Sequence, residues 1–274
     1  SPGGYLDSIL ITGLLPGRDT TVTLATPWFG RGTFTAICST AMTGDVNPGN
    51  DVFSRVFVSS PWVQREDMPV GPARRRVKDA SLVYAPTTGR LYALKGGNTN
   101  EFYSYDITTG TWESLPSMPL DPSGKKAKDG CDLTFNRFQG AAGTIYAIKG
   151  GGVADFYAYD IATRTWTPKR SLSVRNFNFR LPKRGAALAY VPTRGPQGTV
   201  YCAPGNNTLT FIAYDVAADT WSRCPDVPFN PLRKRTCRYG TDMVYDGDSI
   251  IYLLKGSNTT EVWKYYPQFD TWAM

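Results

Sequence analysis

The sequence contains no histidine. A Ser-His-Asp triad, a zinc site with histidine ligands and a histidine-bound copper radical site are therefore all excluded. It also lacks any apolar run of the roughly 18 residues that a membrane-spanning helix needs. The five cysteines show no CxxC spacing, which argues against structural zinc. No Walker or dinucleotide-binding glycine motif and no carboxylate pair stands out, so we predict that the protein is not an enzyme and uses no cofactor or metal.

The sequence is rich in turn-forming and aromatic residues instead. It holds 27 glycines and 20 prolines, and 41% of its residues are hydrophobic, enough for a packed core. A length of 274 residues suits one large domain or two smaller ones. This composition favours an all-β fold of short strands joined by tight turns.

One stretch of the chain occurs four times. The copies are Arg90–Pro116, Thr144–Leu172, Thr199–Pro225 and Ser249–Met274. Each copy ends on a Thr-Trp pair, and a further tryptophan stands upstream, so that the series is Trp62, Trp112, Trp166, Trp221 and Trp272. The intervals are 50, 54, 55 and 51 residues. A period near 50 is typical of a β-propeller blade.

The first copy shows what each unit contains. The short apolar run Leu91–Leu94 predicts a buried strand, and the aromatic run Glu101–Ile107 predicts the next one. Thr111-Trp112 begins an outer strand, and Ser81–Tyr84 adds an inner strand upstream. Counterparts of that inner strand are Cys131–Phe135, Ala186–Tyr190 and Thr241–Tyr245. Four antiparallel strands per unit make a propeller blade, and we expect the tryptophans to be buried between blades.

The marks within each unit resemble the kelch repeat. They are the doublet Gly96-Gly97, Tyr105-Asp106 and Trp112, and the second and third units repeat the Tyr-Asp and Trp marks. The fourth unit departs, with Tyr265-Tyr266 in place of Tyr-Asp, and the last two units keep one glycine of the doublet. The resemblance covers residues 61–274 and implies a kelch-type β-propeller, commonly of six or seven blades.

The two ends of the repeat region leave ring closure open. Trp62–Pro69 matches Trp112–Pro119 and therefore predicts an outer strand without the rest of its blade. Either this strand closes a four-bladed ring, or the chain is part of a larger one. The stop at Trp272-Ala273-Met274, within the equivalent strand, favours the second alternative.

Residues 1–60 lack the repeat. Alternation predicts strands at Ser8–Ile11, Thr21–Ala25, Thr33–Cys38 and Val52–Val58. Leu15-Pro16-Gly17 before a Thr/Val strand and the Asp/Asn-rich turn before the last strand resemble the later half of a bacterial adhesion-related immunoglobulin-like module of the CARDB type. Four strands are half a sandwich, so the segment pairs with something else or its first half lies upstream. The oxygen-bearing residues of this turn are Asp45, Asn47, Asn50 and Asp51. They could bind a calcium ion, but we favour an ordinary solvated turn.

Positive charge gathers at one place in each repeat. Residues 1–60 carry a net charge of −1 and the remainder +8. Just before each inner strand stand basic clusters, and a lysine ends the second strand in three copies. These residues are Arg74, Arg75, Arg76 and Lys78; Lys125, Lys126 and Lys128; Arg175, Arg180, Lys183 and Arg184; Arg233, Lys234, Arg235 and Arg238; and Lys95, Lys149 and Lys255. In a propeller these loops share one face, so the clusters predict a positive funnel that attracts anions.

A second interpretation of these charges stays open. The clusters also suit ordinary solvated loops, and some of the lysines could pair with Glu101, Asp155 and Glu261, which begin the third strand. Of the cysteines, Cys38, Cys131 and Cys202 suit small core positions, and Cys224 and Cys237 could form a disulfide.

These observations predict a non-catalytic, extracellular binding or adhesion module. Its partner would be a protein or an acidic polysaccharide, bound on the basic face. The alternative is a structural subunit of a cell-surface or filamentous assembly, including a homo-oligomer. Nucleic acid is disfavoured, because only the loop with Arg175, Phe177, Phe179 and Arg180 interleaves basic and aromatic residues. An exposed apolar patch on the blades would favour assembly, and a basic channel mouth would favour ligand binding.

Overall fold

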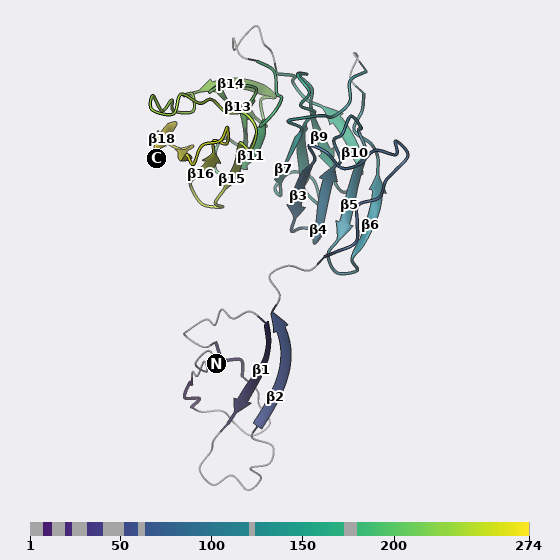
Figure 1. Ribbon diagram of the computed structural model, residues 1–274, viewed down its shortest axis with the longest axis vertical. Coiled ribbons are helices and arrows are strands. Elements are labelled where there is room, and N and C mark those ends of the chain that lie inside the picture. Colours follow the sequence, from purple (N-terminus) through teal and green to yellow (C-terminus); the bar gives the residue numbers. More distant parts are fainter. Residues whose placement is uncertain are drawn as a thin grey trace. The chain divides into compact units, whose positions relative to one another are not determined.

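The computed structural model describes residues 8–12, 20–23, 32–40, 52–59, 64–120, 124–172 and 180–273. The chain divides into two compact units, Ser1–Arg65 and Glu66–Met274 (Figure 1). The described residues form strands and turns and no helix, which confirms the predicted all-β class.

Each repeat of the second unit folds as one four-stranded antiparallel sheet, a propeller blade (Figure 1). The predicted strands are present, with bounds that shift by one or two residues. Blade 1 holds β3 (Ser81–Ala85), β4 (Arg90–Leu94), β5 (Phe102–Asp106) and β6 (Thr111–Leu115). Blade 2 holds β7 (Asp132–Asn136), β8 (Thr144–Ile148), β9 (Phe156–Asp160) and β10 (Thr165–Pro168). Blade 3 holds β11 (Ala187–Val191), β12 (Thr199–Ala203), β13 (Phe211–Asp215) and β14 (Thr220–Cys224), and blade 4 holds β15 (Asp242–Tyr245), β16 (Ile251–Leu254), β17 (Val262–Tyr266) and β18 (Thr271–Ala273).

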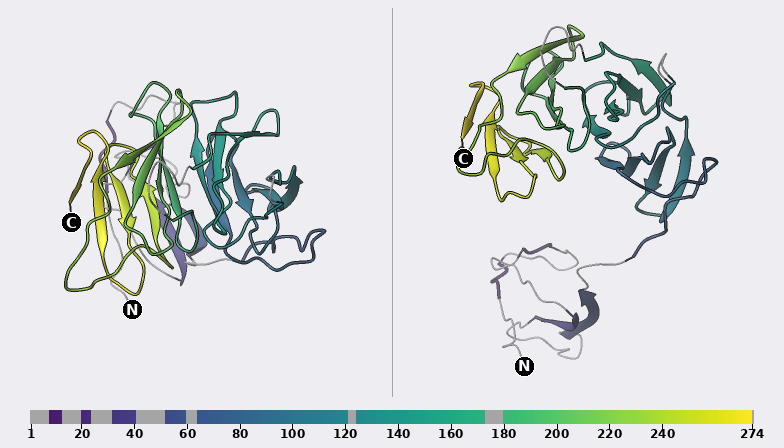
Figure 2. Two further views of the ribbon diagram at one scale, coloured as in Figure 1. Left: turned by 90° about the horizontal axis from the view of Figure 1, so that it is seen from above. Right: turned by 45° about the horizontal axis from the view of Figure 1, so that its top comes forward.

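The four blades follow one another around a common centre (Figure 2). The inner strand β3 packs beside β7, β7 beside β11, and β11 beside β15. Among the described residues, β15 and β3 show no comparable packing, so the series is an arc whose ends are blades 1 and 4. The outer position of blade 4 is taken by its own strand β18. Of the predicted upstream outer strand, residues 64–69 form no strand and residues 61–63 lie outside the described part, so the structure does not show that strand closing a four-bladed ring.

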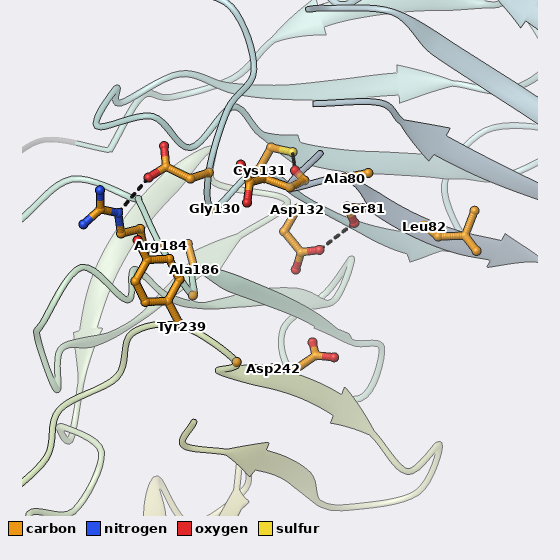
Figure 3. Close-up of a pocket in the computed structure, with 14 residues that line it drawn as sticks. Ala80, Ser81, Leu82, Gly130, Cys131, Asp132, Arg184, Ala186, Tyr239 and Asp242 are labelled. Atoms are coloured by element: carbon orange, nitrogen blue, oxygen red, sulfur yellow. Dashed lines mark hydrogen bonds and ion pairs between the residues drawn. The ribbon is translucent and has the colours of Figure 1, made fainter. Parts of the chain in front are cut away.

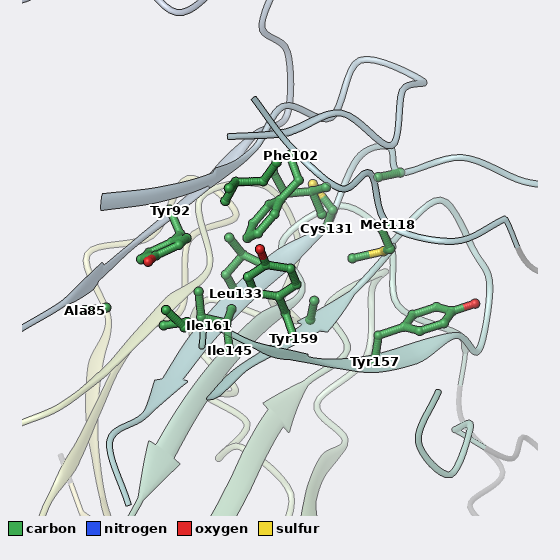
Figure 4. Packing of buried hydrophobic residues seen from close by; sticks show 14 residues of the cluster. Ala85, Tyr92, Phe102, Met118, Cys131, Leu133, Ile145, Tyr157, Tyr159 and Ile161 are labelled. Carbon is green, nitrogen blue, oxygen red and sulfur yellow. The ribbon is translucent and has the colours of Figure 1, made fainter. Parts of the chain in front are cut away.

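Aromatic side chains fill the spaces between blades (Figure 4). Phe102 of blade 1 packs with its ring centroid 4.9 Å from those of both Tyr159 and Trp166 of blade 2. The same trio recurs at the next two interfaces, formed by Phe156 with Tyr214 and Trp221, and by Phe211 with Tyr265 and Trp272. Because such ring pairs bury large apolar areas, they account for the core that the repeat predicts.

The tryptophans are half-buried rather than buried as expected, because they stand on the outer strands. Each indole Nε1 donates to a backbone carbonyl of the segment that precedes its blade, at 2.7–2.9 Å. The acceptors are Glu66, Pro116, Arg170 and Pro225, each four residues after the previous tryptophan of the series. In blades 2, 3 and 4 the acceptor belongs to the segment that follows the outer strand of the previous blade. Glu66 occupies the same position relative to blade 1.

In the first unit the structure describes one antiparallel pair, β1 (Gly32–Ser39) with β2 (Val52–Ser59). The other two predicted strands are wrong over their described parts, residues 8–12 and 20–23, which are irregular. Alternation alone does not make a strand where no neighbouring strand accepts its hydrogen bonds. Cys38, predicted as a core residue, is exposed, since no second layer covers the β1–β2 pair among the described residues. The calcium candidates Asp45, Asn47, Asn50 and Asp51 lie outside the described residues.

The remaining cysteines are buried thiols. Cys131 and Cys202 are core residues, as predicted. The suggested pairing of Cys224 with Cys237 is wrong, because the structure has both as free thiols. Burial raises the pKa of each of these two thiols to about 12, so neither is reactive at neutral pH.

Candidate functional site

One face of the propeller is built from two sets of loops, which we call the loop face. The lead-in loops precede the inner strands and are residues 71–80, 124–131, 180–186 and 231–241. The lead-out loops follow the second strands and are residues 95–101, 149–155, 204–210 and 255–261. Within blade 1 the two are bonded, since Gly97 N donates to Lys78 O at 2.7 Å. Asn98 N then donates to Ala127 O of the next lead-in loop at 3.0 Å.

The same interlocking continues around the arc. Gly152 N donates to Pro182 O between blades 2 and 3, and Asn207 N donates to Cys237 O between blades 3 and 4. Glycine is required where these backbones meet. At Gly185, with φ +74°, an added Cβ would lie 1.4 Å from the Arg238 carbonyl oxygen. The loop face is therefore one connected surface, as the sequence predicts for these loops.

The basic clusters of the lead-in loops stand on this surface. Their exposed members, which we call the basic rim, are Arg74, Arg75, Arg76, Lys78, Lys125, Lys126, Lys128, Arg180, Arg233, Lys234 and Arg235. Lys183, Arg184 and Arg238 are half-buried, and Arg175 lies outside the described residues. Apart from Lys125, none of the rim cations is hydrogen-bonded or ion-paired through its side chain within the described part of the chain.

Between blades 1 and 2 the rim is hollowed by a pocket of about 330 Å³. Its lining residues are Asn98, Gly124, Lys125, Lys126, Lys128 and Gly151. Three ammonium groups around one opening favour a negatively charged occupant.

Three lysines predicted on this face are not available to a ligand. Lys95, Lys149 and Lys255 are completely buried, which corrects the prediction that they add to the exposed charge. Each pairs with the acidic residue six positions on, since Lys95 Nζ lies 2.8 Å from a Glu101 oxygen, Lys149 Nζ 3.0 Å from Asp155 and Lys255 Nζ 2.8 Å from Glu261. In each of these blades the lysine directly follows the second strand and the acidic residue directly precedes the third. This confirms the alternative interpretation, in which these lysines pair with Glu101, Asp155 and Glu261.

The buried pair of blade 1 is the most fully satisfied. Lys95 Nζ also donates to the carbonyls of Pro69 and Val70. Glu101 accepts from Ala73 N at 2.7 Å and from the Tyr103 hydroxyl at 3.0 Å. Burial opposes ionisation of Glu101, but these donors outweigh it and hold the pKa of Glu101 below its usual value. The pair therefore fastens the segment before blade 1 to its lead-out loop.

The centre of the loop face is acidic, not basic. A hollow of about 330 Å³, which we call the central hollow, opens among the inner-strand starts of all four blades (Figure 3). Its charged lining residues are Asp79, Asp129, Asp132, Asp242 and Arg184. Four carboxylates against one guanidinium give this opening the opposite sign to the rim around it. The predicted positive funnel is thus corrected to a basic rim around an acidic centre.

Asp132 is the most constrained of these carboxylates. Its Oδ1 accepts from the Ser81 hydroxyl and its Oδ2 from Leu188 N, both at 2.6 Å, so it joins blades 1, 2 and 3 (Figure 3). Burial, assisted by the nearby charge of Asp242, raises its pKa to about 7 despite these bonds. A carboxyl that is part-protonated at neutral pH reduces the repulsion at the centre.

Arg184 closes one side of the hollow. Its Nε lies 3.2 Å from an Asp129 oxygen, and its guanidinium lies 5.2 Å from the centroid of the Tyr239 ring. Arg238 lies 5.0 Å from the same centroid. Two cations on one tyrosine ring link the loops of blades 3 and 4 by cation–π contacts.

The sequence does carry a signal for the acidic centre. Asp79 and Asp129 each follow a lysine of the basic cluster directly, and Asp132 and Asp242 each stand two residues after a glycine. Their convergence depends on four strands meeting at the centre, which spacing along one repeat does not display.

Within the described residues no group of three or more His, Cys, Asp or Glu side chains is arranged to hold a metal ion. Nor does that part of the chain contain a helix long and apolar enough to cross a membrane.

Comparison with known proteins shows a likeness of fold. No family model matches the sequence, and no curated protein matches it. A solved structure described as "Structure of YjhT" is similar with a TM-score of 0.50 at 14% identity, over 72% of this chain and 65% of that one. A structural genomics protein of unknown function from Bacteroides thetaiotaomicron VPI-5482 has a TM-score of 0.47 at 14% identity, over 74% of this chain and 44% of its own. The chain thus covers less than two thirds of the length of either structure.

Proposed function

We propose that the propeller is a non-catalytic binding module whose basic rim holds an extended, negatively charged partner, an acidic polysaccharide. The observation that carries the proposal is the set of exposed cations on the interlocked loops of one face, which, Lys125 apart, have no ion-pair partner among the described residues. Like charges gathered in this way repel one another and give the fold nothing unless an anion neutralises them.

The acidic centre favours a long ligand over a small one. A small anion could occupy the pocket between blades 1 and 2, but in the central hollow it would meet Asp79 and Asp129, where repulsion opposes it. A chain with many negative groups can follow the rim from blade to blade without entering the hollow. Exposed charges are screened over about 8 Å at physiological ionic strength, so binding should weaken as salt is added.

The kelch character of the repeat and the nature of the first unit belong to the same proposal. The glycine doublet Gly96-Gly97, with φ near +60° at both residues, lets the lead-out loop reach Lys78, which gives the kelch-like motif a structural purpose here.

We further propose that residues 1–60 are part of an immunoglobulin-like module of the CARDB type, supported by the β1–β2 pair. An extracellular location follows from that resemblance.

The rim is tested by replacing Arg74, Arg75 and Arg76 with Ser. Three lost charges should weaken binding of a polyuronate or a sulfated polysaccharide about tenfold at low salt, equal to roughly 1.4 kcal/mol. Isothermal titration in a salt series measures the affinity and its salt dependence. The matched control removes three cations outside the lead-in loops, with Arg137, Arg170 and Arg194 changed to Ser.

Affinity that ignores both the salt and the Arg74–Arg76 substitution contradicts the proposal. If the protein binds poly-glutamate but neither polysaccharide, the ligand of the rim is an acidic protein and not a polysaccharide. Equal losses in the rim variant and in the control variant show that net charge, not the rim, governs binding.

A second candidate function, a structural subunit of an assembly, is favoured by a different observation. The two end blades of the arc expose apolar side chains on the sides where the interior blades bury theirs, with Leu254 of blade 4 and Leu82 of blade 1 as examples. Exposed apolar patches of this kind mark protein–protein interfaces.

A further inference from the structure

Each blade has two sides, and the interior blades show what covers them. The outgoing side packs on the next blade, and in blade 1 it carries Tyr92, Leu94 and Phe102, all buried. The incoming side packs on the previous blade, and in blade 2 it carries Leu133 and Ile145 among its buried residues. Three interfaces of this type occur within the chain, so each outgoing side is matched to an incoming side of the same repeat.

Blade 4 presents an outgoing side that nothing in the described chain covers. By strand register Leu254 stands where Leu94, Ile148 and Ala203 stand in the earlier blades. Those three are 0% exposed, whereas Leu254 is 45% exposed. Likewise Val262 occupies the position of the buried Phe102 and is 48% exposed, and Val244 on the inner strand is 62% exposed.

Blade 1 presents the matching incoming side. Leu82 stands where Leu133 and Leu188 stand in blades 2 and 3, and it is 57% exposed while they are 5% and 4% exposed. Tyr84 of the same strand is also exposed. The outer part of this side is covered, because the segment with Glu66 and Pro69 lies on it. The uncovered part is the inner strand, directly beside the central hollow.

The two end blades also carry a hydrogen-bond acceptor and a matching donor that have no partner among the described residues. At the first two interior interfaces the first residue of an inner strand accepts from the second residue of the next one, since Ser81 Oγ accepts from Leu133 N at 3.0 Å and Asp132 Oδ2 from Leu188 N. At the third, Ala187 offers no such acceptor. In blade 4 the equivalent acceptor is Asp242, whose Oδ1 bonds its own neighbour Met243 N. Its Oδ2 has no partner among the described residues. The corresponding donor is Leu82 N at the other end of the arc.

We infer that copies of this chain associate head to tail, with the outgoing side of blade 4 in one copy seated on the incoming side of blade 1 in the next. A second copy is the occupant because the chain itself holds both an outgoing and an incoming side, and the three interior interfaces show how sides of these two kinds pack together. The halves lie at opposite ends of the arc, where β15 and β3 do not pack together. A head-to-tail interface of this kind is heterologous and builds a ring or a filament.

This inference rests on the second proposed function, the assembly, and is independent of the basic rim. It is tested with the full chain by sedimentation velocity over a concentration series. Val244→Asp disables the outgoing side and Leu82→Asp the incoming side, and both positions are exposed, so the fold tolerates the change. Either substitution should raise the dissociation constant roughly a hundredfold, since an unpaired charge in an apolar interface is strongly unfavourable. Phe138→Asp, at an exposed apolar residue of the β7–β8 loop, is the matched control and should associate as the original chain does.

Mixing the two variants gives the sharpest outcome. Each alone should be monomeric, but the Val244→Asp chain keeps an intact incoming side and the Leu82→Asp chain an intact outgoing side. A 1:1 mixture should therefore form a dimer that grows no further.

Three results overturn the inference. An original chain that stays monomeric throughout the concentration series shows that the two end blades do not bind each other. Loss of association in one variant only, without recovery on mixing, shows a symmetric interface instead. Association that survives both substitutions leaves the assembly function standing and removes the head-to-tail geometry.

Discussion

Blades 1, 2 and 4 each bury a lysine beneath the loop face, whereas blade 3 buries no charged side chain among its described residues. At the two positions of the pair, blade 3 has Pro204 and Thr210. Both members of the ion pair are absent together, and neither is left alone. Because an unpaired buried charge costs several kcal/mol while an apolar replacement of the whole pair can be neutral, such pairs are expected to be present or absent as units.

Blade 3 differs at its inner strand as well. Its first residue is Ala187, where the other blades have Ser81, Asp132 and Asp242. Strands β11 and β12 are buried along their whole length. The blade that holds no charge inside is therefore one whose inner half is fully enclosed.

The largest expected effect comes from making blade 4 lack one half of its pair. Lys255→Met leaves the Glu261 carboxylate, whose side chain is 5% exposed, without its cation. We expect the free energy of unfolding to fall by about 3–5 kcal/mol. Chemical denaturation followed by tryptophan fluorescence measures it.

The control for this prediction is the double substitution Lys255→Met with Glu261→Met, which imitates the uncharged state of blade 3. It should regain a large part of the loss, with a coupling energy of roughly 1–3 kcal/mol. The recovery is incomplete because Trp263 Nε1 and the Pro228 carbonyl also lose partners. A double variant as unstable as the two single losses combined contradicts the idea that the pair behaves as a unit.

A smaller effect is expected from making blade 2 resemble blade 3 at the inner strand. The pKa of Asp132 is about 7 in the folded protein against an ordinary 3.8, chiefly through burial. Between these values the folded state keeps a proton that the unfolded chain has released. The stability from this proton is fully present below about pH 4 and is lost as pH rises through 7.

Asp132→Asn removes that titration and keeps an acceptor for Leu188 N and a polar contact with Ser81. Measured at pH 4, 6 and 8, the stability of the original chain relative to this variant should fall by roughly 1–3 kcal/mol. This is less than the full pKa shift would give at about 1.4 kcal/mol per unit, because Asp132 is partly accessible to solvent, which screens its charge. Asp67→Asn, at an exposed site, is the matched control. Parallel pH curves for the original chain and Asp132→Asn would show that burial does not perturb this carboxyl.

The blades could be predicted because their signals are local. Gly96, Tyr105 and Trp112 recur at nearly fixed spacing, and each has a role that the structure shows within one repeat or across one interface. The burial of Lys95 could not be predicted with the same ease. It depends on the carbonyls of Pro69 and Val70, which come from a segment outside the repeat that contains the lysine.

The site was predictable in part for the same reason. The basic rim follows from clusters that each stand in one loop, but the acidic centre arises only when inner strands from different blades meet. The six-residue spacing of Lys95 and Glu101, repeated in two further blades, was the available sign that these lysines face carboxylates and not solvent. Residues 8–12 and 20–23 show the converse case, where a local strand pattern lacked the partner that makes a strand.

The smallest expected effect concerns an ionic contact that blade 3 makes at the central hollow. Arg184, in its lead-in loop, pairs with Asp129 at 3.2 Å, but the two side chains are 40% and 21% exposed. Water screens such a pair, so Arg184→Gln should lower the free energy of unfolding by only about 0.5 kcal/mol. Added salt should shrink this difference further, whereas the loss caused by Lys255→Met should persist, because buried pairs are screened much less. Denaturation of both variants at low and high salt makes the comparison. If the Arg184→Gln loss equals that of Lys255→Met, or resists salt to the same degree, blade 3 depends on charge as much as its neighbours do, and the distinction between them fails.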